Sequence, residues 1–275
     1  MRRTMTGSRQ TAARSINRNV VSLRSCGGIL AAILVIAILS SCRRAAQPRK
    51  PDAQISDQPS SAELLARVGE SYNRLDSYQD EGVSVTTYNN GRTTELHFTT
   101  AFTRQGRFRF EFWEPAISGG EDRMVVWKDG NTVKSWWTVN PVVESRQDLG
   151  LAIAGATGVS GGTAYLIPPV LMKEAAWKNR TWTDSNDAYR IKDGEEGGAS
   201  YYRVQRLTST GGEKVGGYDI PKTEGKVTYW ICKDSFLLAR VDQETDFGRF
   251  FANQTIRYAT KVNVQIEDTA FQFGH

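Results

Sequence analysis

Gly106-Arg-Phe-Arg-Phe-Glu-Phe-Trp-Glu-Pro115 is the stretch that decides the fold. Its three phenylalanines alternate with two arginines and a glutamate. Because successive side chains of a strand point to opposite faces, this pattern predicts a strand with one apolar face and one face in water. Leu96, Phe98 and Phe102 repeat the alternation upstream. The short connection at 103–106 predicts a hairpin between the two strands.

Strand patterns of this kind recur along most of the chain. Asn90-Gly91 and Asp129-Gly130 are turn dipeptides between them, and short turns indicate an antiparallel meander. In the segment 237–246 the alternation places Leu238 on the same face as Arg240. The predicted strands are 83–87, 94–102, 108–113, 124–128, 132–139, 189–193, 201–207, 227–232, 237–246, 254–258 and 262–266.

A helix is predicted ahead of the strands. Ser60 and Glu63 have the spacing of a capping box, in which each residue's side chain hydrogen-bonds the backbone N–H of the other. Apolar residues then recur at helical spacing at positions 64, 65, 68, 72 and 75. This stripe predicts a helix that lies with its apolar face on the sheet.

An uncharged run of 24 residues, 149–172, interrupts the strands. We interpret it as one or two short apolar helices that form a movable lid over the open side of the sheet. An ordinary buried helix pair is the alternative. Five glycines and a Pro-Pro pair argue against a membrane span, because they interrupt the helix and leave backbone N–H and C=O groups that lipid cannot hydrogen-bond. The predicted lid residues are Leu151, Ile153, Tyr165, Leu166, Ile167, Leu171 and Met172.

The first 41 residues have the three parts of a secretory signal. An arginine-bearing region precedes the apolar run 29–39, which is too short to span a bilayer as a helix. Leu39, Ser40, Ser41 and Cys42 resemble the bacterial lipobox. That resemblance implies cleavage before Cys42, acylation of its thiol, and attachment to a membrane through the acyl chains. An ordinary cleavage site and an uncleaved anchor are the alternatives.

The charge distribution excludes nucleic acid as a partner. The formal net charge is +5, but six of the 35 lysines and arginines lie in residues 1–42, which contain no acid. Removing that segment leaves 29 basic against 30 acidic residues. The polar, proline-containing segment 43–60 is predicted to be a flexible tether. Arg43 stands where an aspartate marks inner-membrane retention in lipoproteins of double-membraned bacteria, which by analogy favours the outer membrane.

Enzymatic chemistry has no candidate residues. His97 and His275 are the only histidines, no Cys/His cluster has metal-ligand spacing, and no serine stands in a nucleophile-elbow pattern. We therefore expect a protein that is not an enzyme and needs no cofactor or metal. Cys232, the one cysteine left after cleavage and acylation, is predicted to be a small buried residue.

The order of elements resembles a family, the superfamily of the bacterial lipoprotein carriers LolA and LolB, which includes the RseB/MucB sensor domain and the LppX-type lipoproteins. The resemblance covers residues 61–273 and rests on an N-terminal helix, a long meander and an apolar insertion. Its motifs are Gly106-Arg107-Phe108-Arg109-Phe110 before Pro115, Asp129-Gly130, Tyr229-Trp230-Ile231-Cys232-Lys233-Asp234, Leu238-Ala239-Arg240-Val241 and Phe271-Gln272-Phe273.

The resemblance implies an α+β fold. A strongly curved antiparallel sheet would form an incomplete β-barrel, closed by the N-terminal helix and the central apolar segment over a cavity for acyl chains. The expected organisation is a signal peptide at 1–41, a tether at 42–60 and a lipid-binding domain at 61–275. The expected cavity residues are Leu96, Phe98, Phe102, Phe108, Phe110 and Phe112.

Three functions stay open at this point. The chain is expected to be an envelope lipoprotein, facing the periplasm, that binds acyl chains of lipids or lipoproteins for carriage or localisation. An RseB-type sensor or interaction module would instead report to a membrane protein partner. A structural lipoprotein would have its barrel filled by its own side chains, which the phenylalanines of the strands would also permit.

Overall fold

The computed structural model describes residues 58–116, 119–176, 181–212, 214–215, 218–219 and 222–273. The predicted signal peptide, Cys42 and the tether as far as residue 57 lie outside the described residues. Every residue of the described hydrophobic core lies between Leu64 and Phe271. The described core thus lies within residues 58–275, and we expect these residues to fold without the preceding segment.

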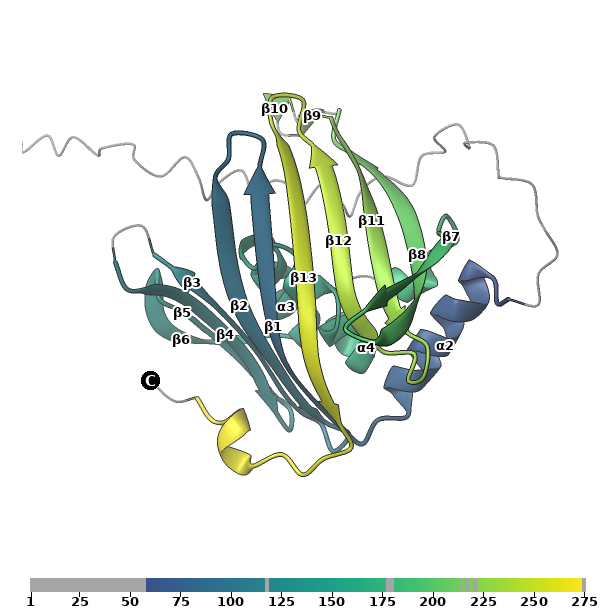
Figure 1. Ribbon diagram of the computed structural model, residues 1–275. Helices are drawn as coiled ribbons and strands as arrows, with labels where there is room; N and C mark the ends of the chain where they lie inside the picture. The colour runs from purple at the N-terminus through teal and green to yellow at the C-terminus, as the bar shows by residue number, and fades with distance from the viewer. Residues whose placement is uncertain are drawn as a thin grey trace, which may run out of the picture.

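Eleven strands form one large antiparallel sheet, in the order β6-β5-β4-β3-β2-β1-β13-β12-β11-β8-β7 (Figure 1). Neighbours in the first half are consecutive in sequence, and the first strand pairs with the last, with Tyr78 opposite Val262 and Tyr88 opposite Ala252. Strands β6 and β7 form the two edges, so the sheet is not closed into a barrel. The predicted antiparallel sheet is thereby confirmed, and its two ends do not pair.

Strands β1 to β4 are longer than the sequence predicted, β5 ends at Trp137 rather than at residue 139, and the strand that follows it was missed. Strand β6 carries residues that are nearly all exposed, so it has no alternation by which to recognise it. The bounds are β1 Ser77–Tyr88, β2 Thr93–Thr103, β3 Arg107–Pro115, β4 Glu121–Asp129, β5 Thr132–Trp137 and β6 Asn140–Arg146.

The second half contains the remaining strands and a two-stranded sheet of β9 and β10, which lies within the segment between β8 and β11. The bounds are β7 Tyr189–Glu196, β8 Ala199–Thr210, β9 Lys214–Val215, β10 Tyr218–Asp219, β11 Thr223–Cys232, β12 Leu238–Asp246 and β13 Phe251–Val262.

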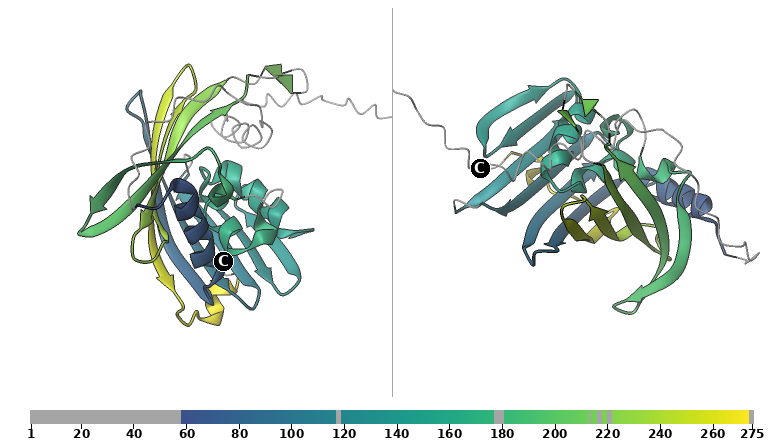
Figure 2. Two further views of the ribbon diagram at one scale, coloured as in Figure 1. Left: turned by 90° about the vertical axis from the view of Figure 1, so that its right-hand side faces the viewer. Right: turned by 90° about the horizontal axis from the view of Figure 1, so that it is seen from above.

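The helices α2, α3 and α4 lie together on one side of the sheet, which we call its concave face (Figure 2). Helix α2 is the predicted N-terminal helix, and the backbone N–H of Ser60 donates to Glu63 at 2.7 Å in the predicted capping box. The bounds are α2 Ser61–Asn73, α3 Leu149–Val159, η1 Thr163–Tyr165, α4 Pro168–Leu171, η2 Lys173–Ala175, η4 Trp182–Asp184 and η5 Asp268–Phe271.

Strand β1 begins earlier than predicted, at Ser77 rather than residue 83. Its valines lie half-buried on the convex face, and its concave positions include Tyr78, Asp80 and Gly82. The strand needs no large apolar side chain at Gly82, because the ring of Phe98 from β2 covers it: a Cβ built there would lie 2.0 Å from the ring. At this position a side chain from the neighbouring strand, rather than an apolar residue of β1 itself, covers the concave face.

The expectation that Leu238 and Arg240 share a face is wrong. The pairing register shifts between Trp230 and Ile231, so that Trp230 lies opposite Arg240 while Ile231 lies opposite Leu238. This bulge adds one residue to β12, which turns Leu238 into the core and leaves Arg240 outside.

Candidate functional site: the covered concave face

The concave face carries a continuous row of aromatic side chains. Ring centroids are 5.3 Å apart for Tyr258 and Phe98, 6.4 Å for Phe98 and Phe110, and 6.5 Å for Phe110 and Phe112. The row therefore crosses four neighbouring strands, from β13 through β1 and β2 to β3. The six residues predicted to line a cavity all belong to this buried core: Leu96, Phe98, Phe102, Phe108, Phe110 and Phe112.

Residues 149–172, which we call the cover, lie on this face. Helix α3 packs against β4, β5 and β6, and α4 packs against α2. Of the predicted lid residues, Leu151 is 50% exposed and points away from the sheet, while Tyr165 is half-buried. The others are buried in the core: Ile153, Leu166, Ile167, Leu171 and Met172.

The interior beneath the cover is closed. Phe98, Phe110 and Phe112 are each 1% exposed. Two hollows on the described residues lie elsewhere, one on the convex face and one beside β7 and Lys233. In this conformation the phenylalanines contact protein side chains, so a ligand reaches them only if the cover moves.

The cover is attached to the sheet mainly by apolar contact. Gln254 of β13 donates a hydrogen bond to the carbonyl of Gly161 at 2.9 Å, and just beyond the cover Lys128 pairs with Glu174 at 3.2 Å. The turn after α3 has two successive left-handed glycines, Gly161 and Gly162, with φ of 59° and 86°. Such glycines let the chain reverse sharply without a Cβ clash.

Helix α3 is intrinsically weak. Three of its eleven residues are glycine, each of which lowers helix stability by about 1 kcal/mol relative to alanine. Packing requires a glycine at position 150, because a Cβ there would lie 2.9 Å from the carbonyl oxygen of Glu174. Packing does not require a glycine at position 155, since a Cβ there would meet nothing within 4 Å. The helix thus depends on its contact with the sheet more than on its own propensity.

Asp80 interrupts the apolar interior with a carboxyl group. Its side chain is 0% exposed and accepts hydrogen bonds from the Tyr78 hydroxyl and the Thr100 backbone N–H, each at 2.7 Å. No lysine, arginine or histidine of the described residues forms an ion pair with it. A buried carboxylate without a counterion is unfavourable, which makes it a candidate functional group.

The surroundings of Asp80 shift several pKa values. Burial raises the pKa of Asp80 to about 7, against the lowering effect of its hydrogen bonds from Tyr78 and Thr100. Burial, together with the nearby Asp80 charge, also raises the pKa of Tyr72, Tyr78 and Tyr258. The Tyr258 hydroxyl is buried and has no hydrogen-bond partner. The structure thus places an acid and an unpaired hydroxyl beside the aromatic row.

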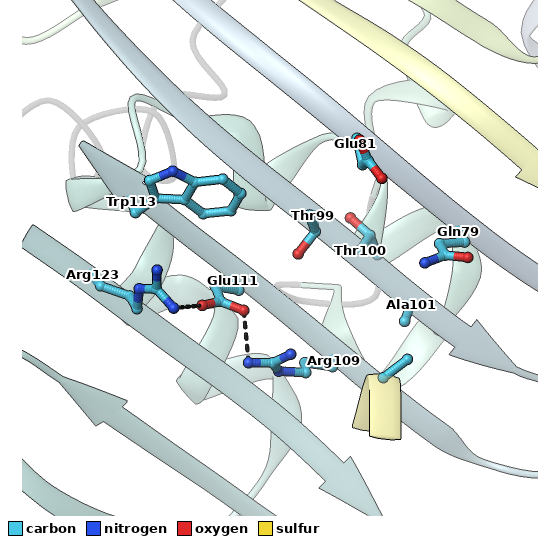
Figure 3. Close-up of a pocket in the computed structure, with 10 residues that line it drawn as sticks. Gln79, Glu81, Thr99, Thr100, Ala101, Arg109, Glu111, Trp113 and Arg123 are labelled. Carbon is cyan, nitrogen blue, oxygen red and sulfur yellow. Dashed lines mark hydrogen bonds and ion pairs between the residues drawn. The ribbon is translucent and has the colours of Figure 1, made fainter. Parts of the chain in front are cut away.

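The convex face carries a separate polar hollow of about 290 Å³ (Figure 3). Glu111 lies on its floor, 5% exposed, and binds Arg109 at 2.6 Å and Arg123 at 2.9 Å. The sequence correctly assigned Glu111 to the face opposite the phenylalanines, but the expectation that this position faces water is wrong. Its two arginines cover the carboxylate, and Trp113, which stacks on His97, and Ala270 of the C-terminal segment border the hollow.

The C-terminal segment lies on the convex face. Phe271 is buried, and Arg107 contacts both its ring and the carboxylate of Asp268, the latter at 2.6 Å. Phe273 stacks on Trp127, with centroids 4.8 Å apart and ring planes within 3°. The aromatic residues of the Phe-Gln-Phe ending therefore shield the outer side of β3 and β4.

Sequence reasoning missed Asp80, whose environment is decided by partners far along the chain. Thr100 is 20 residues away, and Tyr258 is on the last strand. The only local signal was an acid at a position in phase with Tyr78 on one side of a strand. Cys232 was predicted to be buried and is instead half-buried and free. His97 lies on the convex face beside Glu95.

The described residues contain no group of three or more histidine, cysteine, aspartate or glutamate side chains placed to hold a metal ion. Among the same residues, no helix has the length and apolar character to cross a membrane.

No family model matches the chain, and no curated protein matches it. Solved structures are similar in fold at low identity. The LolA superfamily protein NE2245 from Nitrosomonas europaea is 12% identical, over 78% of this chain and 99% of that chain, with a TM-score of 0.33. LprF from Mycobacterium bovis is 10% identical, over 75% of this chain and 94% of that chain, with a TM-score of 0.39.

The complex of MucA and MucB from Pseudomonas aeruginosa gives 11% identity, over 78% of this chain and 61% of that chain, with a TM-score of 0.40. Because the TM-scores lie below 0.5, the function proposed next depends on the geometry of this chain alone.

Proposed function

We propose that the domain binds the acyl chains of amphiphiles between the concave face and the cover. The observation that carries this proposal is the nature of the contact: an uncharged cover packs into the same buried core as the row of phenylalanines and is held on the concave face mainly by apolar packing. Acyl chains offer the same apolar chemistry as Ile153 or Leu171, at about 0.8 kcal/mol per buried CH₂. They can therefore replace the cover's contacts when it lifts.

The cover has the properties that lifting requires. Helix α3 is glycine-rich, its connection to η1 turns at Gly161 and Gly162, and its side chains make few polar contacts with the sheet. Segments of this kind open at lower free energy than the strands that surround them. The closed interior of the structure corresponds, in this proposal, to the unloaded state.

The signal peptide and lipobox complete the proposal. Export and acylation at Cys42 would place the domain on a membrane of the cell envelope, facing the periplasm, with the outer membrane favoured by Arg43. The segment 43–60 would let the domain reach lipids or lipoproteins near that membrane. The biological role would be carriage or localisation of acylated molecules, without catalysis.

A matched pair of variants in α3 tests the proposal. Ile153 faces the sheet and is 2% exposed, whereas Leu151 of the same helix faces solvent. Ile153→Ala removes contacts that hold the cover, so we expect faster association of a fluorescent fatty acid with the domain 58–275. Leu151→Ala should associate at the wild-type rate. If the interior is a solid core, wild type and both variants will leave the probe unbound.

A second candidate function, the interaction module, is favoured by edge strand β6. Val139, next to β6, and Val142 and Val143 within it are 64%, 58% and 43% exposed. An exposed apolar edge strand is a template for strand addition by another chain. A protein partner that loses binding when Val142 and Val143 are changed to lysine, with fatty-acid binding unchanged, would support this function.

A further inference from the structure

Asp80 lies on β1 beside the Tyr258–Phe98 end of the aromatic row, so a carboxyl group stands next to one end of that row. Gly82, two residues along β1, supports the ring of Phe98, and Tyr258 from β13 packs edge-on against the same ring. The row continues from Phe98 to Phe110 and Phe112. An acyl chain lying along the phenylalanines would bring its head close to Asp80.

The hydrogen-bonding capacity at this end is incomplete. A carboxylate can accept about four hydrogen bonds, and Asp80 accepts from Tyr78 and from the backbone of Thr100. The buried Tyr258 hydroxyl makes none. The groups that face Asp80 are Tyr78 on its own strand, Thr100 on β2, Tyr72 on α2, and Tyr258 and Thr260 on β13, while Glu81 points to the convex face. None of them is a cation.

Three tyrosines lie near the carboxylate. Tyr78 donates its hydroxyl to Asp80, and the Asp80 charge contributes to raising the pKa of Tyr72 and Tyr258. A carboxylate head would meet a like charge here, and a neutral hydroxyl would satisfy only part of the site. A head that donates several hydrogen bonds and carries positive charge fits best.

We propose that the Asp80–Tyr258 end of the aromatic row is a head-group subsite selecting amphiphiles whose head is a protonated amine. This inference rests on the proposed acyl-chain function and names its ligand class. The ammonium donates to the free acceptor positions of Asp80 and to the Tyr258 oxygen, while the chain lies on Phe98 and Phe110. Helix α2 covers this end through Tyr72, whose hydroxyl accepts from the Leu238 backbone N–H at 3.1 Å.

The test compares three probes with the same chain, dodecylamine, dodecanol and dodecanoate. Binding to the domain 58–275 is measured by isothermal titration calorimetry at pH 8, below the micellar concentration of each. The variants are Asp80→Asn, which keeps the shape, and Glu81→Gln, which removes the same charge from the next residue on the exposed face. Tyr258→Phe provides a second probe of the subsite, because it removes a hydroxyl that has no partner in the closed structure.

We expect wild type and Glu81→Gln to bind dodecylamine about tenfold or more tightly than dodecanoate, because a hydrogen bond to a charged group contributes that much to affinity. Asp80→Asn should reduce this ratio to about threefold or less, and Tyr258→Phe should lower it in the same direction. Equal binding of the three probes to wild type, or a ratio unchanged in Asp80→Asn and Tyr258→Phe, would overturn the subsite and leave the acyl-chain function standing. Absence of binding by every probe would overturn both.

Discussion

Replacing Asp80 with asparagine should stabilise the domain at alkaline pH, because the native state there carries a buried, unpaired charge. The pKa of Asp80 is about 7 in the folded chain, compared with 3.8 for an unperturbed aspartate. Each unit of difference corresponds to about 1.4 kcal/mol, so ionisation of Asp80 lowers the free energy of unfolding by about 4 kcal/mol above pH 7.

The sign follows from proton binding. Between pH 3.8 and about 7 the folded state holds the Asp80 proton more tightly than the unfolded state does. This contribution to stability is therefore complete below pH 3.8, falls as the pH rises, and is lost above about 7. Other acids, among them Asp193 and Glu196, have lowered pKa values and change stability in the opposite direction. Only a difference between two variants isolates Asp80.

Urea unfolding of the domain at pH 5 and pH 8 measures that difference. From pH 5 to pH 8, the stability of Asp80→Asn relative to wild type should increase by about 2–3 kcal/mol. Glu81→Gln is the control, since it removes the neighbouring acid from an exposed position. A relative stability that does not change with pH would refute the reasoning, because Asp80 would then have an ordinary pKa in the folded chain.

Three further substitutions have defined outcomes. Gly82→Ala should lower the melting temperature, at a cost of about 1–3 kcal/mol, because the added Cβ would lie 2.0 Å from the Phe98 ring. Glu111→Gln should destabilise the domain by about 1–3 kcal/mol in urea unfolding, because it leaves Arg109 and Arg123 facing a neutral side chain, and unchanged stability would contradict the role of the network. Gly155→Ala should stabilise α3 by up to about 1 kcal/mol and slow hydrogen exchange of its amides, and faster exchange would show that the site is not open.

The sheet could be predicted from sequence wherever one strand carried its own apolar face. Strand β3 is the clearest case, because Phe108, Phe110 and Phe112 all enter the core and need no help from neighbours. The start of strand β1 could not be predicted from the alternation of apolar and polar residues. Its concave positions hold Asp80 and Gly82, and the space beside them is filled by side chains from β2 and β13.

The burial of Glu111 on the convex face and of Asp80 on the concave face could not be predicted from sequence, because in each case residues of other strands cover the side chain. The burial of Glu111 depends on Arg123 of the neighbouring strand β4, which forms an ion pair with it. The environment of Asp80 depends on Thr100 of β2 and on Tyr258 of the last strand. Strand alternation assigns a residue to a face but does not tell which other segments cover that face. The apolar cover, in contrast, was recognisable because its uncharged run is continuous in sequence.

Native mass spectrometry of the domain 58–275, purified without detergent and incubated with a twelve-carbon amphiphile, tests acyl-chain binding most directly. The account predicts a complex of one amphiphile per chain, with faster loading in Ile153→Ala than in Leu151→Ala. A chain that stays bare in wild type and in both variants would contradict it, and would mean that the phenylalanines and the cover form a permanent core.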